Sequence, residues 1–292
     1  MADRPLAGKV AVVAGATRGA GRAIAVSLGE AGATVYVTGR SVRGKSATLG
    51  RPETIEETAE MVTARGGVGI AVQVDHTVET EVQALFDRVR LEQTGRLDIL
   101  INDIWGGDEL ADWKVPFWEH SLGNGLLMQE RAVRSHMITS YYGVPLMVAR
   151  GSGLLIEMTD GVDYKCRGNL YYSLAKVSNI HLAACMALDL TPRGVTALAV
   201  TPGFMRSEAV LDFFGVSEAN WREGVKQDPH FAASETPYFV ARAVVAIASD
   251  PNVAAKAGKT LSSWDLAPEY GFIDVDGAQP NWGAWYRENV ES

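Results

Sequence analysis

The chain alternates short runs of β-branched, apolar residues with longer segments of helical periodicity, and this alternation restricts it to few folds. The first run, at 10–14, is apolar at every position, and a glycine-rich turn, a helical segment and a second run at 34–38 follow it. Strands that are apolar throughout are typical of parallel sheets covered on both faces. The alternation therefore predicts an α/β fold built from βαβ units.

The alternation continues along the chain and predicts about seven strands. We expect strands at 10–14, 34–38, 68–74, 97–101, 153–158, 195–200 and 259–261. We expect helices at 21–31, 53–64, 79–92, 126–149 and 170–190, and a last helix that ends at 248. No repeat or low-complexity linker divides the 292 residues. We therefore predict one Rossmann-type, doubly wound parallel sheet with helices on both faces, in a single domain over 1–292. Within it we expect a lid-like substrate segment at about 204–237 and a C-terminal extension at about 262–292.

Composition and charge exclude several classes of function. The net charge is −8 and no basic cluster exists, which argues against a nucleic-acid partner. Cys166 and Cys185 are too few for a disulfide framework, and neither they nor the five histidines have metal-ligand spacing. No apolar leader precedes the first strand, and no run of about 18 apolar residues exists. These features predict a soluble, cytoplasmic protein without a metal or a membrane span.

Three glycines lie in the turn between the first predicted strand and the first helix. Glycine in this turn permits a tight bend and lets a pyrophosphate approach the backbone at the positive end of the helix dipole. We therefore predict a dinucleotide site here. Its expected contacts are Gly15, Thr17, Arg18, Gly19, Ala20 and Gly21.

The end of the second strand indicates which dinucleotide binds. NAD sites place an acidic residue there to accept hydrogen bonds from the adenosine ribose, whereas this chain has Arg40 followed by Ser41. Together with Arg18 of the glycine turn, these residues offer two guanidinium groups and a hydroxyl to a 2′-phosphate. The sequence therefore predicts NADP(H) as the cofactor.

Tyr172 and Lys176 lie four residues apart in the predicted helix at 170–190. This spacing places both side chains on one face, close enough to interact. A nearby ammonium favours the tyrosinate and lowers the pKa of the phenol, which makes a general acid or base near neutral pH. Tyr171 lies about 100° round the helix and should point elsewhere. We predict that Tyr172 and Lys176 are catalytic.

The GxxxGxG spacing of the turn, the YxxxK pair and Pro202-Gly203 after the sixth strand together resemble the short-chain dehydrogenase/reductase (SDR) family. The resemblance implies that Lys176 also binds the nicotinamide ribose. It implies that Pro202 and Gly203 line the nicotinamide, with Ser207 near a threonine of the family. The resemblance extends over nearly the whole chain.

Two further positions match the family pattern. Asp75, at the end of the third strand, matches an aspartate that contacts the adenine region, although a surface-turn aspartate fits equally well. Asn102 matches the first Asn of the family's NNAG stretch, whereas the next three residues differ from it. The match implies that both positions lie near the cofactor.

The C-terminal residues resemble one subgroup of the family in particular. Segments 105–107, 261–267 and 270–277 are similar to the subgroup named after dehydrogenase/reductase family member 1, which implies carbonyl reduction with NADPH. The family also implies a homo-oligomer, a dimer or a tetramer. Residues of the predicted helix at 170–190 fit either a dimer contact or the monomer core: Leu174, Ile180, Ala183, Ala184 and Leu188.

The chain departs from the family at the serine that steadies the substrate oxygen. Counting back from Tyr172 puts Thr159 at this position, and aligning on the fifth strand puts Asp160 there. Thr159 keeps a hydroxyl donor, and we favour it. An ionised Asp160 would raise the pKa of the phenol, and a protonated one would donate a hydrogen bond. The helix before the fifth strand also lacks the family's relay Asn, so we expect a relay through Gln129 or Glu130.

Aromatic residues in two loop regions indicate the substrate. These residues and the apolar Met205 lie beyond the predicted carboxyl ends of the strands. The aromatic residues are Trp105, Trp113, Trp118, Phe204, Phe213, Phe214 and Trp221. Such walls fit a bulky, apolar ketone or aldehyde, although packing of a lid explains any single ring equally well.

The expected reaction is hydride transfer between NADPH and a carbonyl, or the reverse alcohol oxidation, with Tyr172 as the proton donor. Two rival interpretations stay open. One is a non-redox dehydration or isomerisation that uses Tyr172 and Asp160. The other is an NADP-sensing protein that has lost catalysis.

Overall fold

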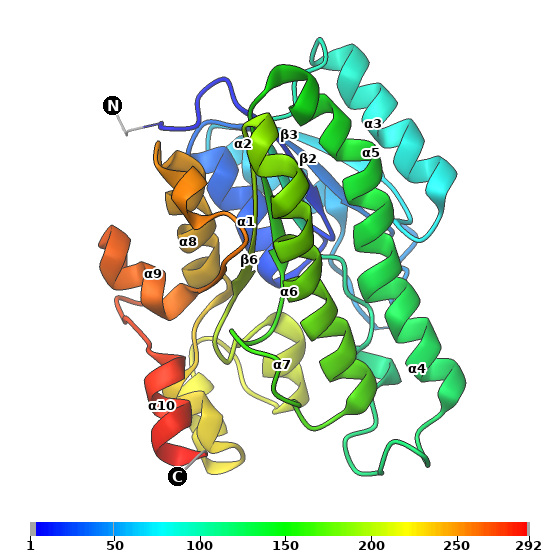
Figure 1. Cartoon of the computed structure of the whole chain (residues 1–292). Coiled ribbons are helices and arrows are strands. Elements are labelled where there is room, and N and C mark those ends of the chain that lie inside the picture. The colour runs from blue at the N-terminus through cyan, green and yellow to red at the C-terminus, as the bar shows by residue number, and fades with distance from the viewer. Residues whose placement is uncertain (1–3, 49, 291–292) are drawn as a thin grey trace.

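The computed structural model describes residues 4–48 and 50–290, which form one sheet of seven parallel strands with helices on both faces (Figure 1). The strand order is β3-β2-β1-β4-β5-β6-β7. The strands are β1 (Val10–Ala14), β2 (Thr34–Gly39), β3 (Val68–Gln73), β4 (Ile99–Asn102), β5 (Gly153–Met158), β6 (Val195–Thr201) and β7 (Thr260–Ser262). This arrangement confirms the predicted Rossmann-type fold. Residues 1–3, 49, 291 and 292 of the predicted domain lie outside the described residues.

Helices cover the sheet in two layers (Figure 1). One layer consists of α1 (Gly19–Glu30), α2 (Ile55–Ala64) and α8 (Pro237–Ser249), and the other of α3 (Glu79–Glu92), α5 (Ser135–Arg150) and α6 (Leu170–Leu190). The shorter helices are α4 (Leu122–Gln129), α7 (Glu208–Phe213), α9 (Ser263–Tyr270) and α10 (Trp282–Asn289). Each long helix therefore has one face on the sheet.

Residues of β1 alternate between two apolar cores. Ala11 and Val13 belong to the core that includes α1 and α8, whereas Val10 and Val12 belong to the core that includes α3. Successive side chains of a strand point to opposite faces. Because helices cover both faces, every position of β1 is buried, which is why this run is apolar throughout.

The helix predicted at 126–149 differs from the structure. It begins earlier, at Leu122, because the Ser121 hydroxyl accepts a hydrogen bond from the Asn124 N–H and caps the first turn. A π-turn, Glu130–Arg134, then separates α4 from α5. The spacing of apolar residues predicts neither the earlier start of the helix nor the π-turn, because each depends on a few hydrogen bonds.

Described residues of the predicted C-terminal extension pack against residues 204–237, the predicted lid-like segment. Arg206 Nη2 lies 2.7 Å from Asp276 Oδ2, and the ring centroids of Phe204 and Trp282 are 5.9 Å apart. Figure 1 shows α10 next to the segment that follows α7. Neither α9 nor α10 was predicted. The contact with Phe204 ties α10 to the fold, and the hydrogen bond from the Ser263 hydroxyl to Glu235 ties α9 to it.

The described residues contain no helix that is both long and apolar enough to cross a membrane. They also bring together no group of three or more His, Cys, Asp or Glu side chains able to hold a metal ion. Cys166 and Cys185 are both free and exposed.

Candidate active site

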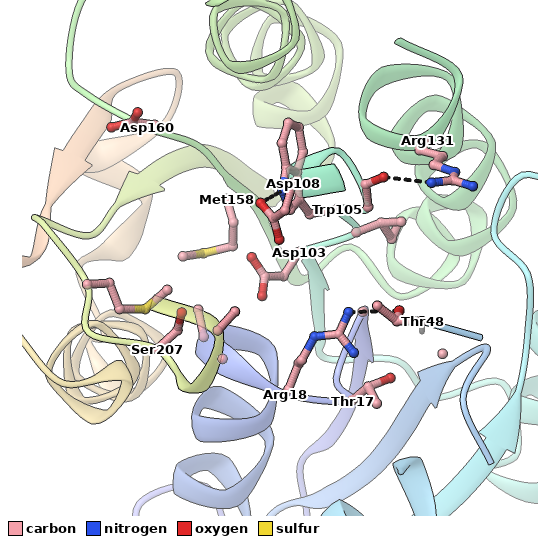
Figure 2. Close-up of a pocket in the computed structure, with 18 of the residues that line it drawn as sticks. Thr17, Arg18, Thr48, Asp103, Trp105, Asp108, Arg131, Met158, Asp160 and Ser207 are labelled. Carbon is pink, nitrogen blue, oxygen red and sulfur yellow. Dashed lines mark hydrogen bonds between the residues drawn. The ribbon is translucent and has the colours of Figure 1, made fainter. Parts of the chain in front are cut away.

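A cavity of about 450 Å³ opens at the carboxyl ends of the strands, where the order of the sheet reverses between β1 and β4 (Figure 2). Ligands bind at this position in doubly wound sheets, and the volume is within the range of ligand pockets. Most of the predicted site residues line it: Gly15, Thr17, Arg18, Gly19, Ala20, Arg40, Ser41, Asp75, Thr159, Asp160, Tyr172, Lys176, Pro202, Gly203 and Ser207.

Two predicted residues, Gly21 and Asn102, do not line the cavity. A Cβ on Gly21 would meet the Gly15 carbonyl oxygen at 2.3 Å, so glycine lets α1 pack closely on the turn. Asn102 is fully buried, and its Nδ2 donates to Ser140 Oγ at 2.8 Å and to Glu157 Oε1 at 2.7 Å. Asn102 thus connects β4 with α5 and β5, and its position does not support the predicted cofactor contact.

The glycine turn approaches the end of β4 closely. Gly15 has φ +89°, and a Cβ on it would meet the Asp103 carbonyl oxygen at 2.4 Å, so both conformation and space require glycine. Burial raises the pKa of the Asp103 carboxyl to about 7, and the charge of Lys176 acts in the opposite direction. Asp103, the first of the three residues that depart from the family stretch after Asn102, is a titratable group of the cavity.

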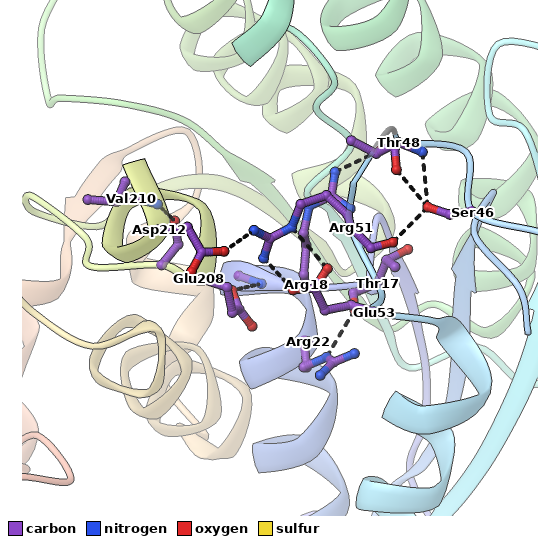
Figure 3. A network of polar contacts seen from close by, with 12 residues as sticks. Thr17, Arg18, Arg22, Ser46, Thr48, Arg51, Glu53, Glu208, Val210 and Asp212 are labelled. Atoms are coloured by element: carbon purple, nitrogen blue, oxygen red, sulfur yellow. Dashed lines mark hydrogen bonds and ion pairs between the residues drawn. The ribbon is translucent and has the colours of Figure 1, made fainter. Parts of the chain in front are cut away.

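A carboxylate binds the N-terminus of α1. Glu208, in the first turn of α7, accepts a hydrogen bond from the Gly19 N–H at 2.9 Å (Figure 3). Helix N-termini bind phosphate through the same N–H groups and the same dipole. Glu208 therefore lies where the glycine turn is predicted to receive a pyrophosphate. No sequence motif pointed to this residue.

Arg51 connects the loop after β2 with α7 (Figure 3). Its guanidinium forms ion pairs with Glu53 of the same loop and with Asp212 of α7. In this loop Thr48 Oγ1 also accepts a hydrogen bond from Arg18 Nη2 at 2.9 Å. These contacts hold the loop and α7 together beside the glycine turn.

Glu208→Gln should tighten NADPH binding by about two- to fivefold, because the variant removes a negative charge that competes for the helix N-terminus. Quenching of tryptophan fluorescence on titration with NADPH measures the dissociation constant. Glu223→Gln, at an exposed glutamate of the same lid-like segment, is the matched control. Unchanged or weaker binding in Glu208→Gln would contradict the competition.

Three arginines line the cavity near the end of β2. Arg40 Nη1 lies 3.8 Å from Asp75 Oδ2, and Arg131 Nη1 donates to the Gly106 carbonyl at 2.8 Å (Figure 2). Burial, followed by the charge of Arg40, lowers the pKa of Arg131. Together with Arg18, these cations suit a phosphate group. The sequence analysis missed Arg131, which belongs to no motif.

Tyr172 lies in the first turn of α6, where the Asn169 side chain accepts hydrogen bonds from the N–H groups of Tyr171 and Tyr172. The Tyr172 hydroxyl donates to Asp160 Oδ2 at 2.7 Å. Burial, and then the charge of Asp160, raises the pKa of Tyr172 well above its usual value. The prediction that this pKa is lowered was wrong, because burial and the Asp160 carboxylate outweigh the opposing charge of Arg167.

Lys176 lies one helical turn after the tyrosine. Its ammonium is 4.3 Å from the ring centroid of Trp105 and 5.5 Å from that of Tyr172. Burial lowers the pKa of Lys176, and three carboxylates oppose this effect, in the order Asp160, Asp103 and Asp108. The lysine is thus the cation at the centre of an acidic group of side chains.

Thr159 and Asp160, the two candidates for the serine role, have different partners. The Thr159 hydroxyl donates to the Lys176 carbonyl oxygen at 2.7 Å. This hydroxyl therefore has no further hydrogen to donate to a substrate oxygen. Asp160 contacts the Tyr172 hydroxyl instead. The geometry favours Asp160 as the side chain that acts on the tyrosine, contrary to our preference for Thr159.

The predicted relay residues do not reach the cavity. Gln129 Nε2 donates to the Tyr171 carbonyl at 2.7 Å, and Glu130 pairs with Arg134 at 3.1 Å on the exposed side of the helix. Both side chains are engaged elsewhere, and neither lines the cavity. The structure does not support a relay through them.

A buried pair joins α5 to β5. His136 Nδ1 is 2.5 Å from Glu157 Oε2, and His136 Nε2 donates to the Ile104 carbonyl at 2.9 Å. Ile104 lines the cavity. His136 therefore holds the chain after β4 in place, and the sequence analysis did not identify it.

Glu235 supports the floor of the cavity. Its Oε2 accepts hydrogen bonds from the Gly203 N–H at 2.9 Å and from the Ser263 hydroxyl at 2.6 Å. Its Oε1 is buried and makes no hydrogen bond. Burial raises the pKa of Glu235 to about 8, so the folded protein holds this carboxyl in its protonated form at neutral pH.

The pKa of Glu235 makes stability depend on pH. The folded pKa of about 8 lies above the ordinary glutamate value of 4.5, so between these values the folded state binds more protons and stability falls as pH rises. The loss reaches about 5 kcal/mol above the folded pKa. Glu235→Gln should remove most of this loss. Thermal unfolding at about pH 5 and about pH 9 measures it, and an equally steep decline in both proteins would contradict the assignment.

The predicted aromatic walls are only partly present. Trp105, Phe204 and Met205 line the cavity, and Trp282 of α10 joins them. Trp113 packs against Tyr172 with ring centroids 5.1 Å apart. The other predicted residues lie elsewhere: Trp118 and Phe213 are exposed, Phe214 packs on Phe231, and Trp221 stacks with Arg206.

Known proteins resemble this chain in sequence. The family model described as enoyl-(acyl carrier protein) reductase matches residues 15–261. Dehydrogenase/reductase SDR family member 1 of Mus musculus is 36% identical over 276 residues, which cover 94% of this chain and 85% of that protein. The Homo sapiens protein of the same name is 36% identical over 282 residues, with the same coverage.

Solved structures resemble it in fold. A short-chain dehydrogenase from Mycobacterium thermoresistibile has a TM-score of 0.79 at 23% identity, covering 95% of this chain and 92% of that one. A 7α-hydroxysteroid dehydrogenase complexed with NADH and 7-oxoglycochenodeoxycholic acid has a TM-score of 0.70 at 23% identity, covering 96% and 98%. At these identities the likeness shows the fold alone.

Proposed function

The chain belongs to the short-chain dehydrogenase/reductase family of oxidoreductases, and we propose that it transfers hydride between NADPH and the carbonyl carbon of a bulky, apolar ketone or aldehyde. The observation that carries this proposal is that Tyr172 and Lys176 share one cavity with the glycine turn and the arginines. The proposal includes a cytoplasmic location, as the composition predicts.

The cavity fits a phosphorylated dinucleotide. The Gly19 N–H at the N-terminus of α1 already binds a carboxylate, so this position accepts an anion. Arg18 and Arg40 would hold a 2′-phosphate, Lys176 would bind the nicotinamide ribose, and Gly203 would line the nicotinamide. When bound, the reduced cofactor supplies the hydride.

The protonation state of Tyr172 supports reduction as the favoured direction. Its raised pKa keeps the proton on the hydroxyl near neutral pH, and reduction of a carbonyl needs a proton donor. The reverse reaction needs a tyrosinate to take a proton from the alcohol, and this form is scarce. Trp105 and Phe204 provide apolar walls for the substrate.

Titration of NADPH and NADH into the purified protein, followed by a panel of carbonyl compounds, tests the proposal. We expect tighter binding of NADPH than of NADH, and loss of NADPH absorbance on addition of a bulky ketone. Tight NADPH binding without turnover of any carbonyl would contradict the reductase. A preference for NADH would contradict the role of Arg18 and Arg40.

Arg40→Ala should weaken NADPH binding by roughly tenfold or more and leave NADH binding nearly unchanged, because the variant removes charge-assisted hydrogen bonds to a 2′-phosphate. Isothermal titration calorimetry with both cofactors measures the two constants. Arg43→Ala is the matched control, since Arg43 lies on the same loop but pairs with Glu60 on the surface. Equal losses for NADPH and NADH in Arg40→Ala would contradict 2′-phosphate recognition.

We further propose that the protein forms a homo-oligomer, a dimer or a tetramer. Within α6, Ile180 and Ala183 are buried in the chain itself, whereas Leu174 and Leu188 are exposed. Exposed leucines on one long helix support a contact between copies. Light scattering coupled to size-exclusion chromatography measures the mass, and a monomer at all concentrations would contradict this proposal.

A further inference from the structure

The side chain that contacts the catalytic tyrosine carries a negative charge. Asp160 Oδ2 accepts the Tyr172 hydroxyl at 2.7 Å, and the raised pKa of Tyr172 makes that hydroxyl a weak acid. Reduction of a neutral carbonyl places negative charge on the substrate oxygen in the transition state. A carboxylate beside the tyrosine opposes this charge. The site is therefore poorly matched to an acceptor that becomes anionic.

Asp108 adds to this field, and Asp103, whose pKa is raised to about 7, adds to it in its ionised form. Asp103 and Asp108 line the cavity with Asp160, and all three act on Lys176. Figure 2 labels all three side chains, with Asp160 drawn apart from Asp103 and Asp108 in this view. Arg167 offsets part of the charge, with its Nε at 3.9 Å from Asp160 Oδ2.

Arg167 does not neutralise Asp160 through a hydrogen bond. Its Nη2 donates to the carbonyl and the carboxylate of Asp163, and its Nη1 donates to the Lys165 carbonyl. The guanidinium is therefore held by its own loop, and the Asp160 side chain stays 38% exposed. A carboxylate in this state can attract a cation from solution.

Tryptophan rings pack around Tyr172, whose hydroxyl contacts the Asp160 carboxylate. The rings of Trp105 and Trp113 meet the Tyr172 ring edge to face, with centroids 5.4 and 5.1 Å from it. Trp113 is 57% exposed. Aromatic faces attract cations, and flat apolar rings pack on them. The Lys176 ammonium already lies over the Trp105 ring, so the exposed Trp113 ring beside Tyr172 and the Asp160 carboxylate are the groups suited to a flat organic cation.

We propose that the preferred hydride acceptor of this site is a cationic C=N group, an iminium on a flat apolar ring system, rather than a neutral C=O group. This inference rests on the proposed function, because it keeps hydride transfer from NADPH and changes the class of acceptor. The carboxylate of Asp160 pairs with the substrate cation, and the aromatic side chains contact its rings.

The reaction balances without a proton from the protein. The hydride of the reduced nicotinamide adds to the iminium carbon and forms a C–H bond, and the π electron pair of C=N becomes the lone pair of the nitrogen. NADPH is oxidised to NADP⁺, and a fully substituted iminium is reduced to a neutral tertiary amine. The reacting pair carries the same total charge before and after the step. The carboxylates therefore stabilise the bound substrate and the transition state alike, which raises kcat/KM.

The first test compares N-methyl-3,4-dihydroisoquinolinium, a permanent iminium, with 1-tetralone, a ketone of similar size. Because the two differ in intrinsic reactivity, the informative quantity is the ratio of their kcat/KM values in each protein. Asp160→Asn removes the charge and keeps the size, and this variant should lower the iminium-to-ketone ratio by about tenfold or more. Asp160→Ser, which restores a hydroxyl, should lower the ratio further by increasing ketone reduction. Thermal unfolding confirms that both variants are folded.

The second test measures binding without turnover. Calorimetry of the protein saturated with NADP⁺ compares N-methylisoquinolinium, a cation, with isoquinoline N-oxide, which has the same rings and no net charge. The cation should bind about tenfold tighter to the wild type, and Asp160→Asn should abolish the difference.

An iminium-to-ketone ratio that changes less than about twofold in both variants, or equal binding of the two compounds, would overturn the inference. Reduction of the ketone alone would overturn it and leave the proposed function intact. If neither substrate is reduced although NADPH binds, the proposed function fails and the calorimetry decides the inference.

Discussion

Tyr172→Phe should lower kcat for carbonyl reduction by about 10²- to 10⁴-fold, because it removes the hydroxyl that donates a proton to the substrate oxygen. NADPH binding should stay within about twofold, since the ring remains in place against Trp105 and Trp113 and the hydroxyl is not assigned to the cofactor. Loss of NADPH absorbance at saturating ketone measures kcat, and fluorescence titration measures the binding.

Tyr171→Phe provides the matched control for this prediction. This variant removes a phenol hydroxyl at the neighbouring position of α6. The Tyr171 ring packs against Gly125 and His120, outside the cavity. Activity should stay within about twofold of the wild type. An equal loss in both variants would indicate a general disturbance of α6, and full activity of Tyr172→Phe would contradict its role as the proton donor.

Arg206→Met should lower the free energy of unfolding by about 2–4 kcal/mol, because it removes a buried guanidinium and leaves its partners without a cation. Arg206 is 1% exposed, lies 2.7 Å from Asp276 Oδ2 and donates to the Ser234 carbonyl at 2.9 Å. These contacts join the lid-like segment to the C-terminal extension. Urea denaturation measures the change.

Arg222→Met is the control for this prediction. Arg222 also stacks on Trp221, with its guanidinium carbon 4.4 Å from the ring centroid, as Arg206 does at 4.2 Å. However, Arg222 is exposed, so its loss should change the free energy of unfolding by at most about 0.5 kcal/mol. Similar losses in the two variants would show that stacking on the tryptophan, and not the buried ion pairs, carries the effect.

The sequence was sufficient to predict the sheet, because its elements follow from local features. The β1 run is apolar since both faces of the strand are covered, and Gly15 is required by its own φ. Helices α3 and α6 have the predicted bounds, because each is amphipathic or capped within its own segment. The positions of Tyr172 and Lys176 on one face follow from helical spacing alone.

The properties of these side chains depended on residues outside the helix that carries them. The Tyr172 phenol meets Asp160 rather than Thr159 because the loop after β5 returns to α6, and burial in the folded chain raises its pKa, the opposite of the effect that the YxxxK spacing predicts. Spacing within a helix says nothing about which carboxylate another segment brings to its surface.

The sequence by itself determined the parallel sheet, the glycine turn and the YxxxK pair, because backbone conformation and apolar periodicity are local. Only the tertiary structure decided which charges surround them. Glu208 reaches the Gly19 N–H from 189 residues away, and Arg131 enters the cavity from a helix without a motif. Electrostatic effects depend on distance in space and on burial, and both arise when the helices pack on the sheet.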